Sequence, residues 1–338
     1  MPRPATDQDI VAIPKIELHV HFGGNLSEAV AIELATRHGL DPRVAVPLVD
    51  GRYPRAYRGF PDFLAALIAL DDLVRTAEDV ETVAAAVARG QAAQGVVYSE
   101  VIVTLLSHLR HGLDPGAFWA ALRSGFAAVP ATRVAIIVDA IRDDGPAALE
   151  ATIRLIEAAD APIVGLALTG TEDSWPIEAF ATMRQTADRL GLGVEIHAGE
   201  MGPPESIAAS LDVLGADRIG HGVAAIRDAS LLERLVREQV PLDVCPTSNV
   251  MIGLYSSLEA HPFRRFLEAG ANVTISSDDP PLMGTTLTDE LRHVVRIAGL
   301  DRDGLAELQR RAARAAFLPA VERLALEARI DAWAEEPG

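Results

Sequence analysis

The sequence predicts an α/β protein built as one (β/α)8 TIM barrel, and three observations carry this prediction. Eight short runs rich in Val and Ile alternate with Ala- and Leu-rich stretches of helical spacing. This alternation is typical of parallel strands joined by crossover helices, and eight strands close a parallel barrel. Polar residues end several of the runs, and a barrel gathers such residues on one face. Although 338 residues could form two domains, barrels of this size are commonly single, so we expect one domain over residues 1–338.

The expected elements follow in chain order. Strands are expected at residues 15–22, 96–104, 133–139, 163–169, 193–198, 218–221, 241–245 and 272–277. Helical spacing appears between them, for example at 147–159, 177–190, 230–238 and 263–269, and residues 300–333 read as helices that complete the outer ring.

The first two expected strands are separated by too many residues for one crossover. The gap contains Pro47, Pro54 and Pro61. We therefore expect an insertion of extra helices at about residues 23–95, over the barrel mouth. A lid and a decorative surface insertion are about equally compatible with the sequence.

The composition excludes several classes of function. A formal net charge of −18 and the lack of a basic stripe argue against nucleic acid and anionic membranes as partners. No apolar run approaches the roughly 18 residues of a membrane span, and no signal peptide is apparent. Cys245 is the only cysteine, which excludes an internal disulfide and fits a reducing compartment. We expect a cytoplasmic protein of unknown oligomeric state.

Histidines and acids that end the apolar runs predict a metal site. His19 and His21 are two apart on an expected strand, so both imidazoles point to one face. Such a pair alone is weak evidence, since strand histidines are usually structural. Further candidates end other runs, at His197, at His221, and at the adjacent acids 278 and 279. Three imidazoles and a carboxylate suit Zn²⁺ or a similar divalent ion.

Five motifs occur in an order that resembles the adenosine deaminase family of the amidohydrolase superfamily. They are His-Val-His at 19–21, His-Ala-Gly-Glu at 197–200, Gly-His-Gly at 220–222, Val-Cys-Pro-Thr-Ser-Asn at 244–249 and Ser-Asp-Asp-Pro at 277–280. The resemblance covers nearly the whole chain. It implies one Zn²⁺ per chain, or another divalent transition metal, bound by His19, His21, His197 and Asp278.

The resemblance also implies roles for four residues around a purine ring. Glu200 corresponds to the family's proton donor to N1, and Asp279 to the residue that hydrogen-bonds N7. His221 is the candidate general base or orienter of the attacking water, although a fifth ligand or an outer hydrogen-bond donor are alternatives. Gly170 stands where the family offers a backbone N–H to N3.

The main departure from the family follows the first histidine pair. Adenosine deaminases usually continue with Leu-Asp-Gly and adenine deaminases with Ile-Glu-Gly, whereas this chain has Phe22-Gly-Gly-Asn25. Gly23 thus replaces an acid that in adenosine deaminases meets the ribose 5′-hydroxyl. Relatives that deaminate 6-aminodeoxyfutalosine also lack this acid, so a 5′-modified adenosine derivative is the expected substrate, with adenosine or adenine as alternatives.

Three arginines of the insertion are candidates for the 5′ side of such a substrate. Arg52, Arg55 and Arg58 alternate with two tyrosines and could offer a guanidinium to a carboxylate. Loop arginines that merely offset an acidic surface are the more ordinary interpretation.

Two other classes of function compete with the deaminase. The first is a superfamily member that cleaves an amide or ester. Its substrate would lack the two ring nitrogens that Glu200 and Asp279 match in a purine. A catalytically inactive metal-binding protein would need neither Glu200 nor His221.

Overall fold

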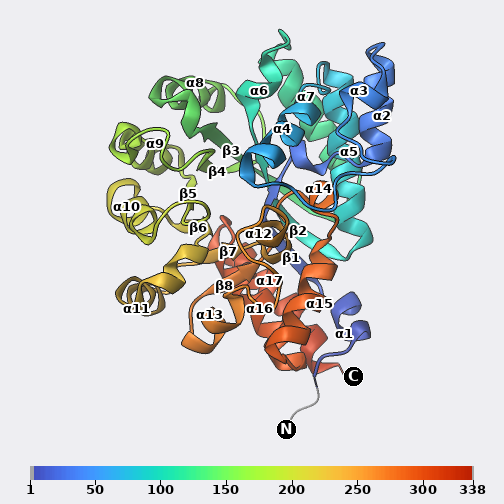
Figure 1. Cartoon of the computed structure of the whole chain (residues 1–338). Helices are drawn as coiled ribbons and strands as arrows, with labels where there is room; N and C mark the ends of the chain where they lie inside the picture. Colours follow the sequence, from blue (N-terminus) through green and yellow to red (C-terminus); the bar gives the residue numbers. More distant parts are fainter. Residues whose placement is uncertain (1–3, 337–338) are drawn as a thin grey trace.

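The computed structural model describes residues 4–336, and its centre is a barrel of eight parallel strands surrounded by helices (Figure 1). The hydrogen-bonded order of the strands follows the chain from first to last. Their bounds are β1 (Lys15–His21), β2 (Val96–Val103), β3 (Arg133–Ile141), β4 (Ile163–Thr169), β5 (Gly193–Ala198), β6 (Arg218–His221), β7 (Leu242–Val244) and β8 (Val273–Ile275). Every expected strand is present, which confirms the predicted fold class.

The barrel closes between β8 and β1 by a short seam. Val20 forms an isolated parallel bridge with Asp278, just beyond the end of β8. The N–H of His21 donates to the carbonyl of Asp278 at 2.9 Å, and the N–H of Asp278 donates to the carbonyl of His19 at 3.2 Å. The backbone bonds that close the barrel therefore also fix three of the expected metal ligands relative to one another.

Helices cover the outside of the barrel. After β2 they are α6 (Leu105–Leu109), α7 (Pro115–Ala127), α8 (Pro146–Glu157), α9 (Thr182–Leu190), α10 (Pro204–Leu214), α11 (Ala229–Glu238), α12 (Pro246–Met251), α13 (Phe263–Ala269), α14 (Pro280–Met283), α15 (Leu287–Ala298), α16 (Arg302–Ala315) and α17 (Ala320–Glu335). One expectation needs correction, because residues 177–190 do not form a single α-helix. A 3-10 helix, η3 (Ile177–Phe180), precedes α9, as is common at helix N-termini.

The long gap between β1 and β2 holds four helices, as predicted. They are α2 (Glu28–Arg37), α3 (Pro42–Ala45), α4 (Phe60–Asp71) and α5 (Ala77–Ala93). A further short helix, α1 (Asp7–Ala12), precedes β1 and packs against α15. Tyrosine hydroxyls anchor the segment before α4, since Tyr53 donates to the carbonyl of Leu26 at 2.9 Å and Tyr57 to that of Leu282 at 3.1 Å.

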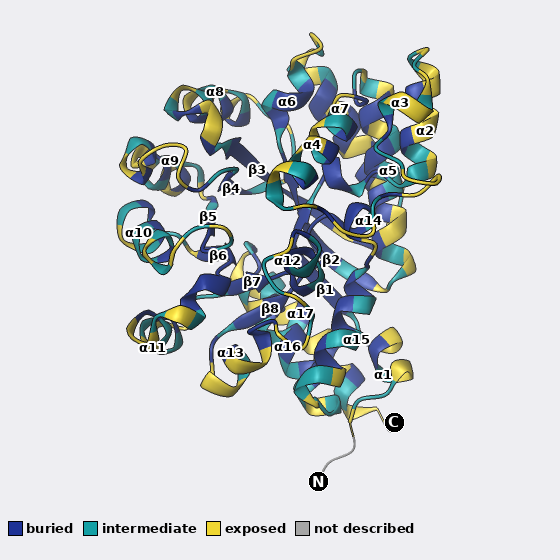
Figure 2. Cartoon of the chain, viewed as in Figure 1, coloured by how far each residue is buried: buried dark blue, intermediate teal, exposed yellow. Residues whose placement is uncertain are grey.

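Burial follows the layers of the barrel. The strands are buried along nearly their whole length, while the surrounding helices expose their outer faces (Figure 2). Strands covered on both faces explain why the sequence shows continuous apolar runs rather than strict alternation. Among residues 4–336, no helix combines the length and apolar character that crossing a bilayer requires.

Candidate active site

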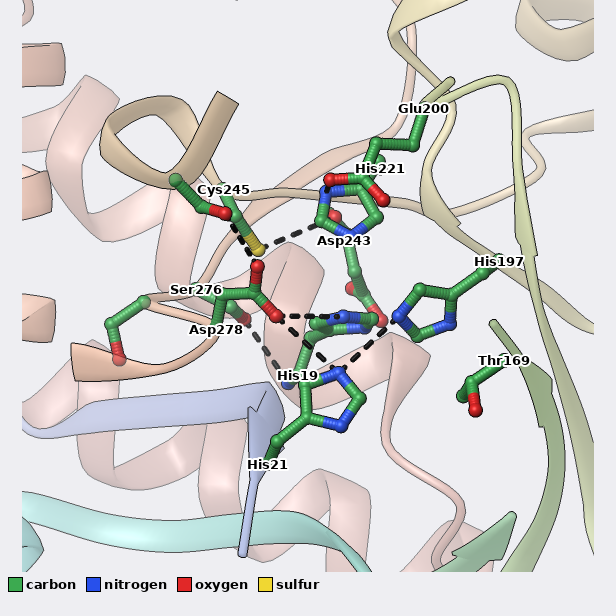
Figure 3. Close-up of polar contacts among 12 residues, drawn as sticks. His19, His21, Thr169, His197, Glu200, His221, Asp243, Cys245, Ser276 and Asp278 are labelled. Atoms are coloured by element: carbon green, nitrogen blue, oxygen red, sulfur yellow. Dashed lines mark hydrogen bonds and ion pairs between the residues drawn. The ribbon is translucent and has the colours of Figure 1, made fainter. Parts of the chain in front are cut away.

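The four expected metal ligands converge at the carboxyl ends of the strands (Figure 3). The Nε2 atoms of His21 and His197 lie 3.3 Å apart. Asp278 Oδ1 lies 3.5 Å from His19 Nε2 and 3.3 Å from His21 Nε2. All four side chains are almost completely shielded from solvent.

This arrangement fits a tetrahedral metal ion. Ligand atoms about 2.1 Å from a zinc ion stand about 3.4 Å from one another at the corners of a tetrahedron, close to the three separations observed. His19 Nε2 is buried and has no hydrogen-bond partner among the described residues. An unpartnered buried nitrogen is costly unless a ligand satisfies it. The donors present could therefore hold a divalent metal.

A buried ion-pair network orients His19 from behind. Its Nδ1 contacts the carboxylate of Glu195, and Arg218 Nη2 lies 2.6 Å from Glu195 Oε2 and 2.7 Å from Glu100 Oε2. Burial opposes ionisation of Glu195, but the charges of Arg218 and His19 outweigh it and lower the pKa to about 2. The carboxylate thus favours a proton on Nδ1, which leaves the Nε2 lone pair directed at the metal position. Glu195 was not among the residues expected from the sequence, although it shares a strand face with His197 two residues later.

Two residues of the site have a left-handed backbone. His221 has φ = 60° and Asp278 has φ = 65°, a region that residues with a side chain seldom adopt. Outliers of this kind concentrate at functional sites, where surrounding structure holds them in place. Ser248 supports the second residue, because its hydroxyl donates to Asp278 Oδ2 at 2.6 Å.

Glu200 and His221 lie together above the metal position. Glu200 Oε1 is 3.6 Å from His221 Nδ1, and the side-chain amide of Asn249 lies 3.3 Å from each of these atoms. Burial raises the pKa of Glu200 well above its usual range, and the negative charges of Asp278 and Glu172 raise it further. The surroundings of Glu200 therefore favour its protonated form. Asn249, the last residue of the motif at 244–249, thus contacts both groups.

Glu172 fixes the loop that carries Glu200. Its Oε1 accepts hydrogen bonds at 2.9 Å from the backbone N–H groups of Glu200, Met201 and Gly202. Its Oε2 accepts from the N–H of Gly199 at 2.7 Å. No sequence pattern identified this role, because it depends on a contact between two loops. Glu172 follows β4, and the backbone that folds over it follows β5.

Asp279 reaches the site from beside Asp278. Its Oδ1 is buried without a hydrogen-bond partner among residues 4–336. Gly24 makes this placement possible, since a Cβ at position 24 would lie 1.6 Å from Asp279 Oδ1. Burial and the charge of Asp278 raise the pKa of Asp279 well above its usual range. Gly170, the fourth expected contact to the purine, has φ = +89° and lies across the same cavity.

These side chains share one cavity of about 250 Å³. Its floor includes His21, His197, Glu200, His221, Asp278 and Asp279. Its other wall is the apolar face of α4, with Phe60, Phe63, Leu64, Leu67 and Ile68. Helix α4 of the insertion thus forms one wall of the cavity.

The arginines of the insertion were candidates for the 5′ side of a substrate, and that assignment stays a prediction. None of Arg52, Arg55 and Arg58 lines the cavity, and Arg58 is exposed and paired with Asp62 at 3.0 Å. The reason is that the tyrosines between them point inward and anchor the segment, which turns the arginines away from the site. The guanidinium in the cavity lining belongs to Arg110, which follows β2.

A parallel barrel with buried imidazoles and acids at the carboxyl ends of its strands has the architecture of a barrel enzyme, whose active site lies at this face. The chain belongs to the adenosine deaminase family, whose model matches residues 14–333. It is 36% identical over 333 residues to an aminodeoxyfutalosine deaminase of Streptomyces avermitilis, covering 96% of this chain and 92% of that protein. The protein is therefore an aminohydrolase.

Two solved structures are similar along almost the full chain. An adenine deaminase of Arthrobacter aurescens is 29% identical with a TM-score of 0.86, covering 96% of this chain and 100% of that one. An amidohydrolase of Burkholderia ambifaria crystallised with bound Zn is 22% identical with a TM-score of 0.87, covering 99% and 97%. The second likeness is one of fold.

Proposed function

We propose that the protein deaminates C6 of an adenine-containing nucleoside or a 5′-modified adenosine derivative, such as 6-aminodeoxyfutalosine, releasing ammonia. The observation that carries the proposal is the position of Glu200 and Asp279, two buried acids with raised pKa values that flank His221 and the histidine cluster in one cavity. Two protonated acids match two ring nitrogens of a purine, both of which are hydrogen-bond acceptors. An amide or ester substrate has no such pair.

The residues divide the work around the ring. His19, His21, His197 and Asp278 would hold Zn²⁺ or a similar ion, which when bound supplies a water of lowered pKa as the nucleophile. His221, neutral because burial lowers its pKa to about 3, orients that water through its ring nitrogen. Glu200 donates its proton to N1, where negative charge would otherwise accumulate. Asp279 donates a hydrogen bond to N7, and the backbone N–H of Gly170 binds N3.

The extent of the cavity supports a substrate larger than the free base. Besides the histidine cluster, its lining includes α4 side chains and residues as far along the chain as Arg110 and Asp144. Apolar α4 side chains suit the apolar part of a 5′ substituent, and the similarity to a protein named aminodeoxyfutalosine deaminase supports a 5′-modified substrate. Adenine deamination is the second candidate, favoured by the 29% identical structure from Arthrobacter aurescens.

A panel of substrates tests the proposal. Zinc-loaded protein should release ammonia from at least one of adenosine, 5′-deoxyadenosine and 6-aminodeoxyfutalosine, with smaller kcat/KM for adenine. Release from adenine alone would support the second candidate. Full metal content without ammonia release from any member would contradict a deaminase and support a metal-binding protein.

A further inference from the structure

Two carboxyl groups of the cavity, the half-buried Asp71 and the buried Asp139, have no part in the chemistry at C6. Asp71 ends α4, and Asp139 lies in β3; both line the cavity. The Oδ1 atom of each is buried and has no hydrogen-bond partner within residues 4–336. Asp139 is only 2% exposed, and its other oxygen accepts hydrogen bonds from the hydroxyls of Thr104 and Thr169. Each acid therefore has one oxygen whose hydrogen-bonding capacity no described residue uses.

Gly23 is the glycine that replaces the family's acid, and the carboxyl group of Asp71 occupies the space that a side chain at position 23 would need. A Cβ on Gly23 would lie 1.9 Å from Asp71 Oδ1, so no larger residue fits there without moving the carboxyl group. The neighbouring Gly24 accommodates Asp279 in the same way. A carboxyl group is thus present beside position 23, but it comes from α4 of the insertion rather than from the segment after β1.

We infer that Asp71 and Asp139 form a subsite that binds sugar hydroxyl groups attached to the purine, so that Asp71 is a specificity-determining residue for nucleosides. This inference rests on the proposed deaminase function. Asp71 and Asp139 would recognise the sugar of the substrate, whereas Glu200, Asp279 and Gly170 would contact only the base.

The electrostatics of the pair match hydroxyl groups. Burial and the charge of Asp139 raise the pKa of Asp71 to about 7, and burial raises that of Asp139 to about 6 despite its hydroxyl donors. Near neutral pH the two groups therefore offer both a proton donor and an acceptor, and a sugar hydroxyl is both as well. A free base has no hydroxyl to satisfy these buried oxygens, so it would leave them unpaired.

The surrounding charges disfavour a phosphorylated substrate. Asp72, Asp143 and Asp144 also line this part of the cavity. The one guanidinium in the lining, that of Arg110, is 3.8 Å from Asp144. A phosphate near five carboxyl groups would be repelled, whereas a neutral sugar would not.

The experiment compares Asp71→Asn and Asp139→Asn with the wild type on adenosine, 2′-deoxyadenosine, 3′-deoxyadenosine, adenine and AMP. Asp62→Asn is the matched control, because Asp62 lies on the same helix but does not line the cavity. We expect Asp71→Asn to lower kcat/KM for adenosine by about 10-fold or more, chiefly through KM, while adenine turnover changes less than twofold. Asp139→Asn should act in the same direction.

Binding of the product separates this inference from the proposed function. Calorimetry should show inosine binding more tightly than hypoxanthine to the wild type, with the difference reduced in Asp71→Asn and kept in Asp62→Asn. Equal losses for adenosine and adenine in Asp71→Asn, or AMP as the preferred substrate, would overturn the inference while deamination stands. No ammonia from any of these compounds or from 6-aminodeoxyfutalosine would instead overturn the proposed function.

Discussion

Glu172 Oε1 accepts a hydrogen bond at 2.9 Å from the backbone N–H of Glu200, so one buried acid holds the segment that carries another. Two further N–H groups of the same loop donate to the same oxygen. Burial and the charge of Asp278 raise the pKa of Glu200, and the charge of Glu172 adds to them. Glu172 thereby positions the proposed proton donor and contributes to its raised pKa.

We predict that Glu172→Gln lowers kcat by about 10-fold or more while zinc content stays at one per chain. The amide offers one acceptor oxygen in place of two and has no charge, so the loop loosens and Glu200 ionises more readily. The alkaline limb of the pH–rate profile should accordingly shift to lower pH, which a purely structural defect would not cause. Asp173→Asn, at the exposed neighbour, serves as the control. An unshifted limb would contradict the electrostatic part of the prediction.

Glu200→Gln tests the proton donor itself. The variant should retain its metal and lose at least about 10²-fold in kcat, the loss typical of a positioned acid. Steady-state kinetics with metal analysis measures both quantities. Loss of metal in this variant would mean that Glu200 is a ligand. Glu200, His221 and Asp278 lie close enough together to hold a metal ion in that case.

The pH dependence follows from the protonated state that Glu200 needs. Because burial and nearby negative charges raise its pKa, the acid is competent at low and neutral pH and loses its proton as the pH rises. Turnover should therefore fall on the alkaline side, and the residual turnover of Glu200→Gln should lack this limb. A wild-type rate that keeps rising through alkaline pH would contradict protonation of Glu200 as a requirement.

His19→Ala should reduce bound zinc well below one per chain. His19 supplies an unpartnered buried Nε2 and is oriented by Glu195, so its removal takes away a ligand and one of the two ionic partners of that acid. Metal analysis after dialysis measures the loss, and chelation of the wild type should lower its Tm because the metal binds the folded state. His293→Ala, at a histidine away from the cluster, is the control. Full zinc occupancy in His19→Ala would contradict the proposed ligand set.

The sequence was informative where local pattern decides structure. Strand-forming runs and the histidines at their ends give the barrel and bring His19, His21 and His197 to one face, because parallel strands all end on the same side. Glu195 could also have been predicted, because it lies two residues before His197 on the same strand and so points to the same face. Glu172, Asn249 and Asp71 were not, since their roles depend on loops and on α4 meeting the barrel ends in space. The arginines of the insertion show the same limit, because the pattern does not say which side chains point inward.

Asp71 also makes a prediction about stability. Burial and the charge of Asp139 raise its pKa in the folded protein to about 7, from 3.8 as the ordinary value of an aspartate. The folded state therefore binds this proton more tightly than the unfolded chain, so the contribution of Asp71 to stability is greatest at low pH and is lost as the pH rises through about 7. Asn stays neutral at every pH, so the Tm of Asp71→Asn relative to the wild type should increase between pH 5 and pH 8. Differential scanning calorimetry of Asp71→Asn and Asp62→Asn across this range measures the difference, and a Tm difference for Asp71→Asn that does not change with pH would contradict it. A variant that becomes more stable while it loses nucleoside turnover would indicate that the carboxyl group is retained for binding rather than for folding.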